Sequence, residues 1–257
     1  MLKLTRKLAP HDEKSLMAAL CAFARGDGAA QSSKGASRRL LVAWYGSFPG
    51  HGTIGDQRSA EALVAHLVGA GHQVMHATAL PLDLPGAKRV DWGSVDPASI
   101  DATIFVCGPI LRAHPQTEAL FARFAHKPLA GVGVSLLPPA HSSFANPFDF
   151  VLARQGTTEH FGDLAVIAPD ETSKDGTAAK VDRPEKIIGI SLRGMQDEYG
   201  RENCLSHTTE VEIGRVLDRI GAVHSIKVLP LENHLARAGQ TANAIEASYA
   251  KCDLVLT

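Results

Sequence analysis

The stretch from Leu40 to Leu67, LLVAWYGSFPGHGTIGDQRSAEALVAHL, is the most informative part of this chain. It opens with an apolar run, Leu40 to Tyr45, that predicts a buried strand. A loop with four glycines follows, and apolar residues at helical spacing then predict a helix from Asp56 to Gly69. Asp56 is interpreted as the N-cap of that helix. The stretch therefore predicts a strand, a glycine-rich loop and a helix in direct succession.

The alternation of apolar bursts and helical stretches continues along the chain. Further strands are expected at Gln73 to Thr78, Thr103 to Cys107, Leu129 to Val134, Phe150 to Ala153, Leu164 to Ala168, Lys186 to Leu192, Ser225 to Leu229 and Leu254 to Leu256. Further helices are expected at residues 12–25, Thr117 to Phe124, Thr208 to Ile220 and Ala238 to Ala250. Because the apolar runs are continuous rather than alternating, they favour strands buried on both faces, as in a parallel sheet.

Composition along the chain predicts two α/β domains. Residues 1–37 are expected to form a short helix and a flexible linker, and residues 38–169 a Rossmann-like domain. Residues 170–185 are polar and read as an interdomain linker. Residues 186–257 restart the alternation with three strands, which is too few for a matching domain. We therefore expect two Rossmann-like parallel-sheet domains, resembling the type B glycosyltransferase arrangement, with the second truncated because the sequence is a fragment.

Overall composition excludes several classes of function. The 257 residues are 45% hydrophobic and 21% charged, as in an ordinary globular protein. Lys plus Arg (26) and Asp plus Glu (27) nearly cancel and aromatic residues make up only 5%, which disfavours nucleic acid as a partner. No apolar run reaches the roughly 18 residues of a membrane span. The four cysteines form no Cys-x-x-Cys pair, which favours reduced thiols and a cytoplasmic protein.

Histidine spacing does not indicate a metal site. His72 and His76 are four residues apart, but they fall on an expected strand and no His-Glu-x-x-His pattern is present. We therefore predict neither a metal ion nor a cofactor.

The glycine loop suits an anionic ligand. Glycines let a ligand approach the backbone, and the free N–H groups of a helix N-terminus favour a phosphate or carboxylate. The loop has no Gly-Lys-Ser/Thr of a Walker loop, and Gly50, Gly52 and Gly55 lie too far beyond the strand for the usual dinucleotide turn. A purely structural turn remains the alternative interpretation.

Five segments in order resemble the polysaccharide pyruvyl transferase family. Tyr45-Gly46 and then Gly52-Thr53-Ile54-Gly55-Asp56 resemble its N-terminal signature, in which a Gly-Asn-x-Gly-Asp loop follows the first strand and leads into a helix. The other four are FVCGPI (105–110), KPLAGVGV (127–134), DFVLAR (149–154) and IGISLR (188–193). There are three departures: Thr53 stands where Asn is usual, Gly108 alone remains of a glycine run, and the family's Arg-x-His element after a strand like 253–257 is not in the sequence.

The resemblance implies an enzyme that transfers a pyruvyl group from phosphoenolpyruvate to a sugar of a cell-surface or exopolysaccharide, forming a ketal and releasing phosphate. Such a reaction needs cationic groups and helix N-termini for the donor, together with a proton donor and a base. The resemblance leaves the catalytic residues unknown; His51 is a candidate that could supply a proton or a hydrogen bond to the acceptor, with a solvated loop histidine as the alternative. The candidate substrate-binding residues are Gly52, Thr53, Gly55, Asp56, Arg154 and Arg193. For the two arginines, structural ion pairs are the alternative, and for Asp56 it is a helix cap.

Two other functions remain open from the sequence. A glycosyltransferase of the same layout would place the diphosphate of a sugar nucleotide on the same loop. A non-catalytic binding or remnant protein would account for the missing Arg-x-His element and for Thr53.

Overall fold

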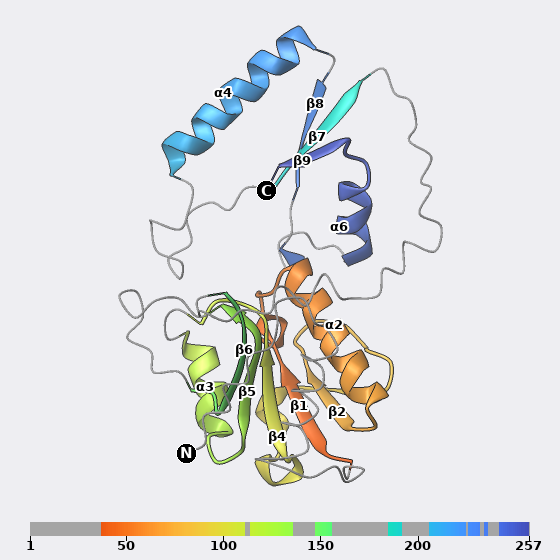
Figure 1. Cartoon of the computed structure of the whole chain (residues 1–257), viewed down its shortest axis with the longest axis vertical. Coiled ribbons are helices and arrows are strands. Elements are labelled where there is room, and N and C mark those ends of the chain that lie inside the picture. Colours follow the sequence, from red (N-terminus) through yellow and green to blue (C-terminus); the bar gives the residue numbers. More distant parts are fainter. Residues whose placement is uncertain are drawn as a thin grey trace. The chain divides into compact units, whose positions relative to one another are not determined.

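The computed structural model describes residues 37–110, 114–135, 147–155, 185–191, 206–224, 226–231, 234–235 and 242–256. The chain divides into two compact units, Met1–Ala168 and Pro169–Thr257. Both consist of helices and parallel strands, so this is an α/β protein of Rossmann-like architecture (Figure 1). The helix expected at residues 12–25, the strand expected at Leu164–Ala168 and most of the expected linker lie outside the described residues.

In the described part of the first unit, six parallel strands form one sheet in the order β3-β2-β1-β4-β5-β6. The strands are β1 (Arg39–Ala43), β2 (Gln73–Ala77), β3 (Ala87–Val90), β4 (Ala102–Val106), β5 (Leu129–Ser135) and β6 (Phe150–Gln155). After β1 the chain moves outward to β2 and β3 and then returns to place β4 on the other side of β1. This reversal is the topological switch point of a Rossmann sheet, beyond whose carboxyl edge ligands bind.

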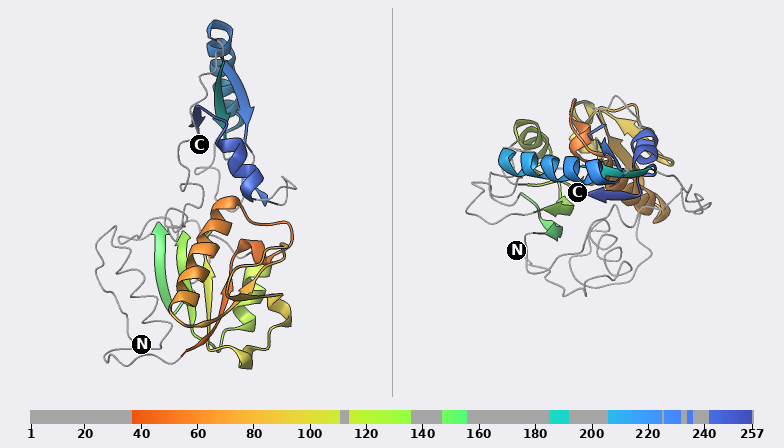
Figure 2. Two further views of the ribbon diagram at one scale, coloured as in Figure 1. Left: turned by 90° about the vertical axis from the view of Figure 1, so that its right-hand side faces the viewer. Right: turned by 90° about the horizontal axis from the view of Figure 1, so that it is seen from above.

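Helices pack on both faces of this sheet. The stripe of α2 (Ile54–Gly69), formed by Ala60, Leu63, Val64 and Leu67, is buried, and α2 packs against β1, β2 and β4 (Figure 2). The opposite face carries a core that includes Leu41, Ala43 and Phe105 together with Leu120 and Phe121 of α3 (Pro115–Arg123). Short 3₁₀ turns lie at η1 (Tyr45–Ser47), η2 (Trp92–Ser94) and η3 (Pro97–Ser99).

The strand β3 was not expected from the sequence. Its four residues, AKRV, include two charged side chains and are only half-buried or exposed. Because β3 pairs with β2 alone and forms the edge of the sheet, it needs no continuous apolar run.

The second unit is a smaller parallel sheet. Its described strands are ordered β8-β7-β9, with β7 at Lys186–Ile190, β8 at Ile226–Pro230 and β9 at Leu254–Leu256, and its helices are α4 (His207–Val223) and α6 (Ala242–Tyr249). Ile188 pairs with both Val228 and Leu254, so these three side chains share one face. Val228 is 38% exposed and Leu254 52% exposed, which leaves this face partly uncovered.

Candidate functional site

The loops that follow β1 and β4 contact each other at the switch point. The hydroxyl of Tyr45, just after β1, donates a 2.6 Å hydrogen bond to the carbonyl of Pro109, just after β4. The Cys107 thiol lies 3.6 Å from the carbonyl oxygen of Asp56 in the first turn of α2. Among the described residues, Cys107 is the one non-glycine residue with a positive φ (60°). The sheet therefore brings the glycine loop against a strained turn at the edge where Rossmann sheets bind ligands.

The glycine loop is also tied to β2. The Ser47 hydroxyl donates to the carbonyl of Ala77 at 2.6 Å and accepts from the backbone N–H of Trp44 at 3.0 Å. The backbone N–H of Ala79 donates to the carbonyl of Gly46 at 2.9 Å. Together with the bond from Tyr45 to Pro109, these contacts hold the loop on both sides of β1.

The start of α2 corrects one expectation from the sequence. Thr53 is the N-cap of the helix, and Asp56, which the sequence suggested for that role, stands three residues later. The backbone N–H of Thr53 donates to the Asp56 carboxylate at 2.9 Å, and the Asp56 N–H donates back to the Thr53 hydroxyl at 3.3 Å. This is a capping box, in which threonine serves as well as the asparagine usual in the resembled family. The amides of Ile54 and Gly55 have no acceptor within the helix and point out of its N-terminus.

Packing or backbone conformation explains why three of the four loop positions are glycine. A Cβ at Gly46 would overlap the indole of Trp44, and one at Gly52 (φ 96°) would stand 3.1 Å from the Cα of Gly46. Gly50 has a φ of 79°, which side chains rarely adopt. Gly55 differs, because a Cβ there would meet nothing closer than the Thr53 hydroxyl at 3.8 Å. Internal packing of the described residues therefore does not explain why position 55 lacks a side chain.

His51 has a neighbour that sequence reasoning missed. Its ring centroid lies 4.9 Å from that of His114, with the two rings nearly perpendicular (86°). His114 occupies the N-cap position of α3 and also contacts Tyr45 (6.3 Å) and Phe48 (5.8 Å). The signal in the sequence is Pro115, which is typical of the first residue of a helix and so marks His114 as its N-cap. Two imidazoles thus meet at the carboxyl edge.

Of the two candidate arginines, Arg154 lies at this same edge. Its Nη2 and Nε both donate to the hydroxyl of Ser135, at 2.9 and 3.3 Å. Ser135 is fully buried at the end of β5, and its backbone N–H donates to the carbonyl of Gly108 in the turn after β4. Arg154 is thereby positioned next to that turn. Arg193 lies outside the described residues.

A buried histidine underlies the glycine loop. His76 on β2 is 1% exposed, and its ring lies parallel to that of Trp44 with centroids 6.0 Å apart. Within the described part of the chain neither ring nitrogen has a hydrogen-bond partner, nor does Trp44 Nε1. Burial lowers the pKa of His76 to about 4. His72, by contrast, precedes β2 and accepts a hydrogen bond from the Arg38 amide, so the two histidines lie at different levels of the sheet.

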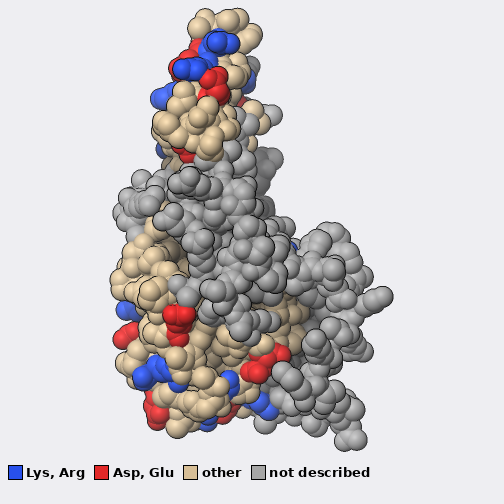
Figure 3. Space-filling model, turned by 90° about the vertical axis from the view of Figure 1, so that its left-hand side faces the viewer, with Lys and Arg blue, Asp and Glu red and all other residues tan. Residues whose placement is uncertain are grey.

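The described residues were searched for a metal site, for a membrane-spanning helix and for a patch of like charge. These residues include no group of three or more His, Cys, Asp or Glu side chains placed to hold a metal ion. None of their helices has the length and hydropathy needed to cross a membrane. On the face drawn in Figure 3, their acidic and basic side chains are interspersed rather than gathered by sign.

Comparison of the chain with models of protein families, with curated proteins and with solved structures finds no match. The fold and the edge geometry define the class, an α/β protein with a Rossmann-like sheet whose glycine loop lies at the switch point.

Proposed function

We propose that the carboxyl edge of the first sheet binds phosphoenolpyruvate, and that the protein is a polysaccharide pyruvyl transferase-like enzyme that acts on a sugar of a cell-surface or exopolysaccharide. One observation carries this proposal. Four segments that resemble that family either follow β1 or overlap β4, β5 and β6, and these four strands are consecutive neighbours in the sheet. Because all strands are parallel, the loops that follow these segments lie along one edge.

The edge supplies groups suited to this donor. The N-terminus of α2, with the unobstructed backbone at Gly55, offers amides to a phosphate or carboxylate. The guanidinium of Arg154 offers a second anion contact, since arginine matches the geometry of both groups. In this reaction His51, which lies beside His114, would give a proton to the methylene carbon of the donor while a sugar hydroxyl adds to the adjacent carbon and loses its proton to a base. A second hydroxyl of the sugar would then lose its proton as it displaces the phosphate, which leaves and completes the ketal. Arg193, which lies outside the described residues, stays a prediction from the resemblance.

The finer architecture belongs to the same proposal. The two units would correspond to the two domains of a type B glycosyltransferase-like enzyme, and the reaction would take place in the cytoplasm.

A sugar-nucleotide-dependent glycosyltransferase is the second candidate. The strand order of the first sheet is the one that binds nucleotides in Rossmann domains, and a diphosphate would suit the same helix N-terminus. Stabilisation of the full chain by sugar nucleotides, with none by phosphoenolpyruvate, would establish this function instead. Stabilisation by neither would favour the non-catalytic binding protein.

The variant Gly55→Ala separates a ligand role from a structural one. A Cβ at position 55 meets ordinary contacts only, so alanine in this first helical turn should not lower the melting temperature. Alanine should nevertheless weaken the binding of phosphoenolpyruvate, measured by calorimetry, by about tenfold, the loss of one good contact. The matched control is Gly69→Ala in the last turn of α2, where a Cβ meets no atom within 4 Å, and it should leave affinity unchanged.

Activity is tested separately from binding. The full chain, and any longer form of it, would be incubated with phosphoenolpyruvate and a panel of glycans, and phosphate release and ketal formation would be measured. Failure to release phosphate or form a ketal with any acceptor, together with unchanged binding in Gly55→Ala, would overturn the proposal.

A further inference from the structure

His76 and Trp44 join β2 to the glycine loop through a continuous series of contacts. His76 pairs in register with Val42, and Trp44 follows two residues later on the same face of the sheet. The imidazole and the indole lie parallel, at an interplanar angle of 12°. The indole in turn lies against the backbone at Gly46 and Gly52, where a side chain would strike it or its neighbours. Trp44 therefore lies between His76 and the glycine loop.

Burial of the His76 ring costs free energy, and no hydrogen bond from the described residues offsets it. Polar atoms buried without a hydrogen-bond partner cost about 1–3 kcal/mol each, and most such groups in proteins have an explanation. His76 leaves both ring nitrogens in this state. The neutral ring tolerates this position, whereas an imidazolium would place a full charge there.

No neighbouring element offers that charge a counterion in the described structure. From β1 the neighbours on this face are apolar, Val42 and Trp44. From β3 the register partner is Arg89, a like charge that is itself paired with Asp83 at 3.3 Å.

The third neighbouring element, α2, packs on β2 with an apolar stripe. The charged residues beside that stripe, Arg58 and Glu61, are paired with each other at 2.6 Å. The buried Gln57 donates to Glu61 as well. The carboxylate of Glu61 is therefore already engaged twice on its own helix.

We propose that His76 and Trp44 form an acid-sensitive latch that holds the glycine loop closed on β2, and that protonation of His76 releases the loop. An imidazolium gains solvent only if Trp44 lifts away. That movement breaks the hydrogen bonds from Ser47 to Ala77 and from Ala79 to Gly46, which tie the loop to β2. The latch itself is independent of the ligand. Only its consequence, loss of the donor at low pH, rests on the proposed function.

The direction and size of the effect follow from linkage. The pKa of His76 falls from the ordinary 6.5 to about 4 when it is buried, so the open state binds more protons between these values. Opening is therefore favoured as the pH falls. With these two values, the equilibrium constant for opening rises about twentyfold between pH 7 and pH 5.

Hydrogen exchange of the full chain, without ligand, tests the latch. Exchange is measured at pH 7 and at pH 5 and corrected for the intrinsic effect of pH on amide exchange. The opening equilibrium constant of the amides of residues 44–57 should then be about twentyfold higher at pH 5, the factor expected from linkage. Amides of β4 and β5 should change little. His76→Phe, which keeps a ring against Trp44, and His76→Leu should both abolish the pH effect. The exposed His126→Phe is the matched control and should retain it.

Two results would overturn the latch. One is that amide exchange of residues 44–57 depends on pH no more strongly in the wild type than in His76→Phe. The other is exchange that rises first in β2 and β3 while residues 44–57 stay protected, which would mean that His76 reaches solvent by fraying of the sheet edge. Failure of phosphoenolpyruvate to bind at any pH would bear on the proposed function alone.

Discussion

Thr53 and Asp56 hydrogen-bond each other in both directions at the start of α2. The Asp56 carboxylate accepts from the Thr53 backbone N–H and hydroxyl, each at 2.9 Å, while the Thr53 hydroxyl accepts from the Asp56 N–H at 3.3 Å. The pair determines where the helix begins and so aims the amides of Ile54 and Gly55 at the edge of the sheet.

Thr53→Ala should lower the free energy of unfolding by about 1 kcal/mol, because alanine cannot accept the hydrogen bond from the Asp56 N–H. Thr53→Asn keeps a capping oxygen and should stay close to wild type. Urea unfolding followed by circular dichroism measures both. Equal stability of the alanine and asparagine variants would show that the cap contributes nothing.

Gly46→Ala should destabilise the protein by about 1–3 kcal/mol, because its Cβ would overlap the Trp44 indole and force the loop or the ring to shift. Gly69→Ala on α2 serves as the control, since a Cβ there meets no atom within 4 Å. The measurement is the urea midpoint of each variant. A Gly46→Ala protein as stable as the control would contradict the packing of Trp44 beneath the loop.

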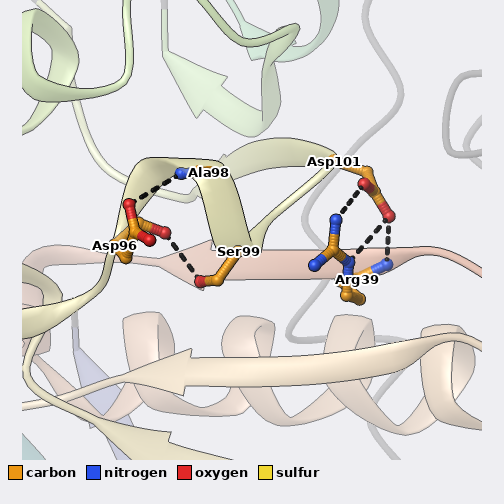
Figure 4. Close-up of polar contacts among 5 residues, drawn as sticks. All are labelled: Arg39, Asp96, Ala98, Ser99 and Asp101. Carbon is orange, nitrogen blue, oxygen red and sulfur yellow. Dashed lines mark hydrogen bonds and ion pairs between the residues drawn. The ribbon is translucent and has the colours of Figure 1, made fainter.

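Arg39 should hold the pKa of Asp101 low at the amino edge of the sheet, where the two side chains are hydrogen-bonded (Figure 4). Hydrogen bonds from the Arg39 side chain, then from its backbone N–H, lower the pKa of Asp101 below its usual 3.8. Arg39→Met should raise that pKa only part of the way back, because the backbone N–H of residue 39, 2.8 Å from Asp101 Oδ2, still donates. Carboxyl chemical shifts followed by NMR during an acid titration measure the change. Full return to the usual value would mean that the backbone contact has no effect.

The same pair affects stability at low pH. Because the pKa of Asp101 is lowered in the folded state, its contribution is present above the usual value of 3.8 and is lost as the pH falls through the folded value. Asp101→Asn should therefore remove part of the acid sensitivity below pH 4, and a variant with an unchanged acid profile would contradict this.

The free energy of unfolding should also depend on pH through His76, at higher pH than for Asp101. Its folded pKa of about 4 lies below the unfolded 6.5, so stability is complete above pH 6.5 and falls as the pH drops toward 4. The loss is at most about 3 kcal/mol, from 1.36 kcal/mol per pKa unit. Urea unfolding at a series of pH values should show this slope in wild type and in His126→Phe but not in His76→Phe. Identical slopes in all three proteins would refute the burial of a neutral imidazole.

Much of the fold could be predicted from the sequence, because buried parallel strands require continuous apolar runs. The runs at residues 73–78, 103–107 and 129–134 are strands within one residue of their expected limits. The edge strand β3 escaped detection because an edge position needs no such run. The first residue of α2 was also misplaced, because Thr53 and Asp56 are both good caps and only their mutual hydrogen bonds show which begins the helix.

The candidate site could be predicted less well than the fold. The sequence singled out His51, but not His114, because 62 residues separate them and only the parallel order of β1 and β4 brings their loops together. It considered His76 only for a metal site, which the spacing from His72 did not indicate, and did not foresee the contact of His76 with Trp44. Burial and ring contacts depend on neighbours from other strands, which spacing along one strand does not contain.

The sequence by itself determined the parallel α/β class and the glycine loop before α2, since both depend on local apolar patterns and turn residues. The tertiary structure alone decided what each glycine does. Glycine at positions 46 and 52 leaves room for the Trp44 indole and the neighbouring backbone, and Gly50 adopts the positive φ of its turn. Gly55 leaves the helix N-terminus open. The physical reason is that a glycine's role depends on the atoms its missing Cβ would meet, and here those atoms come from the folded loop and from Trp44 beneath it.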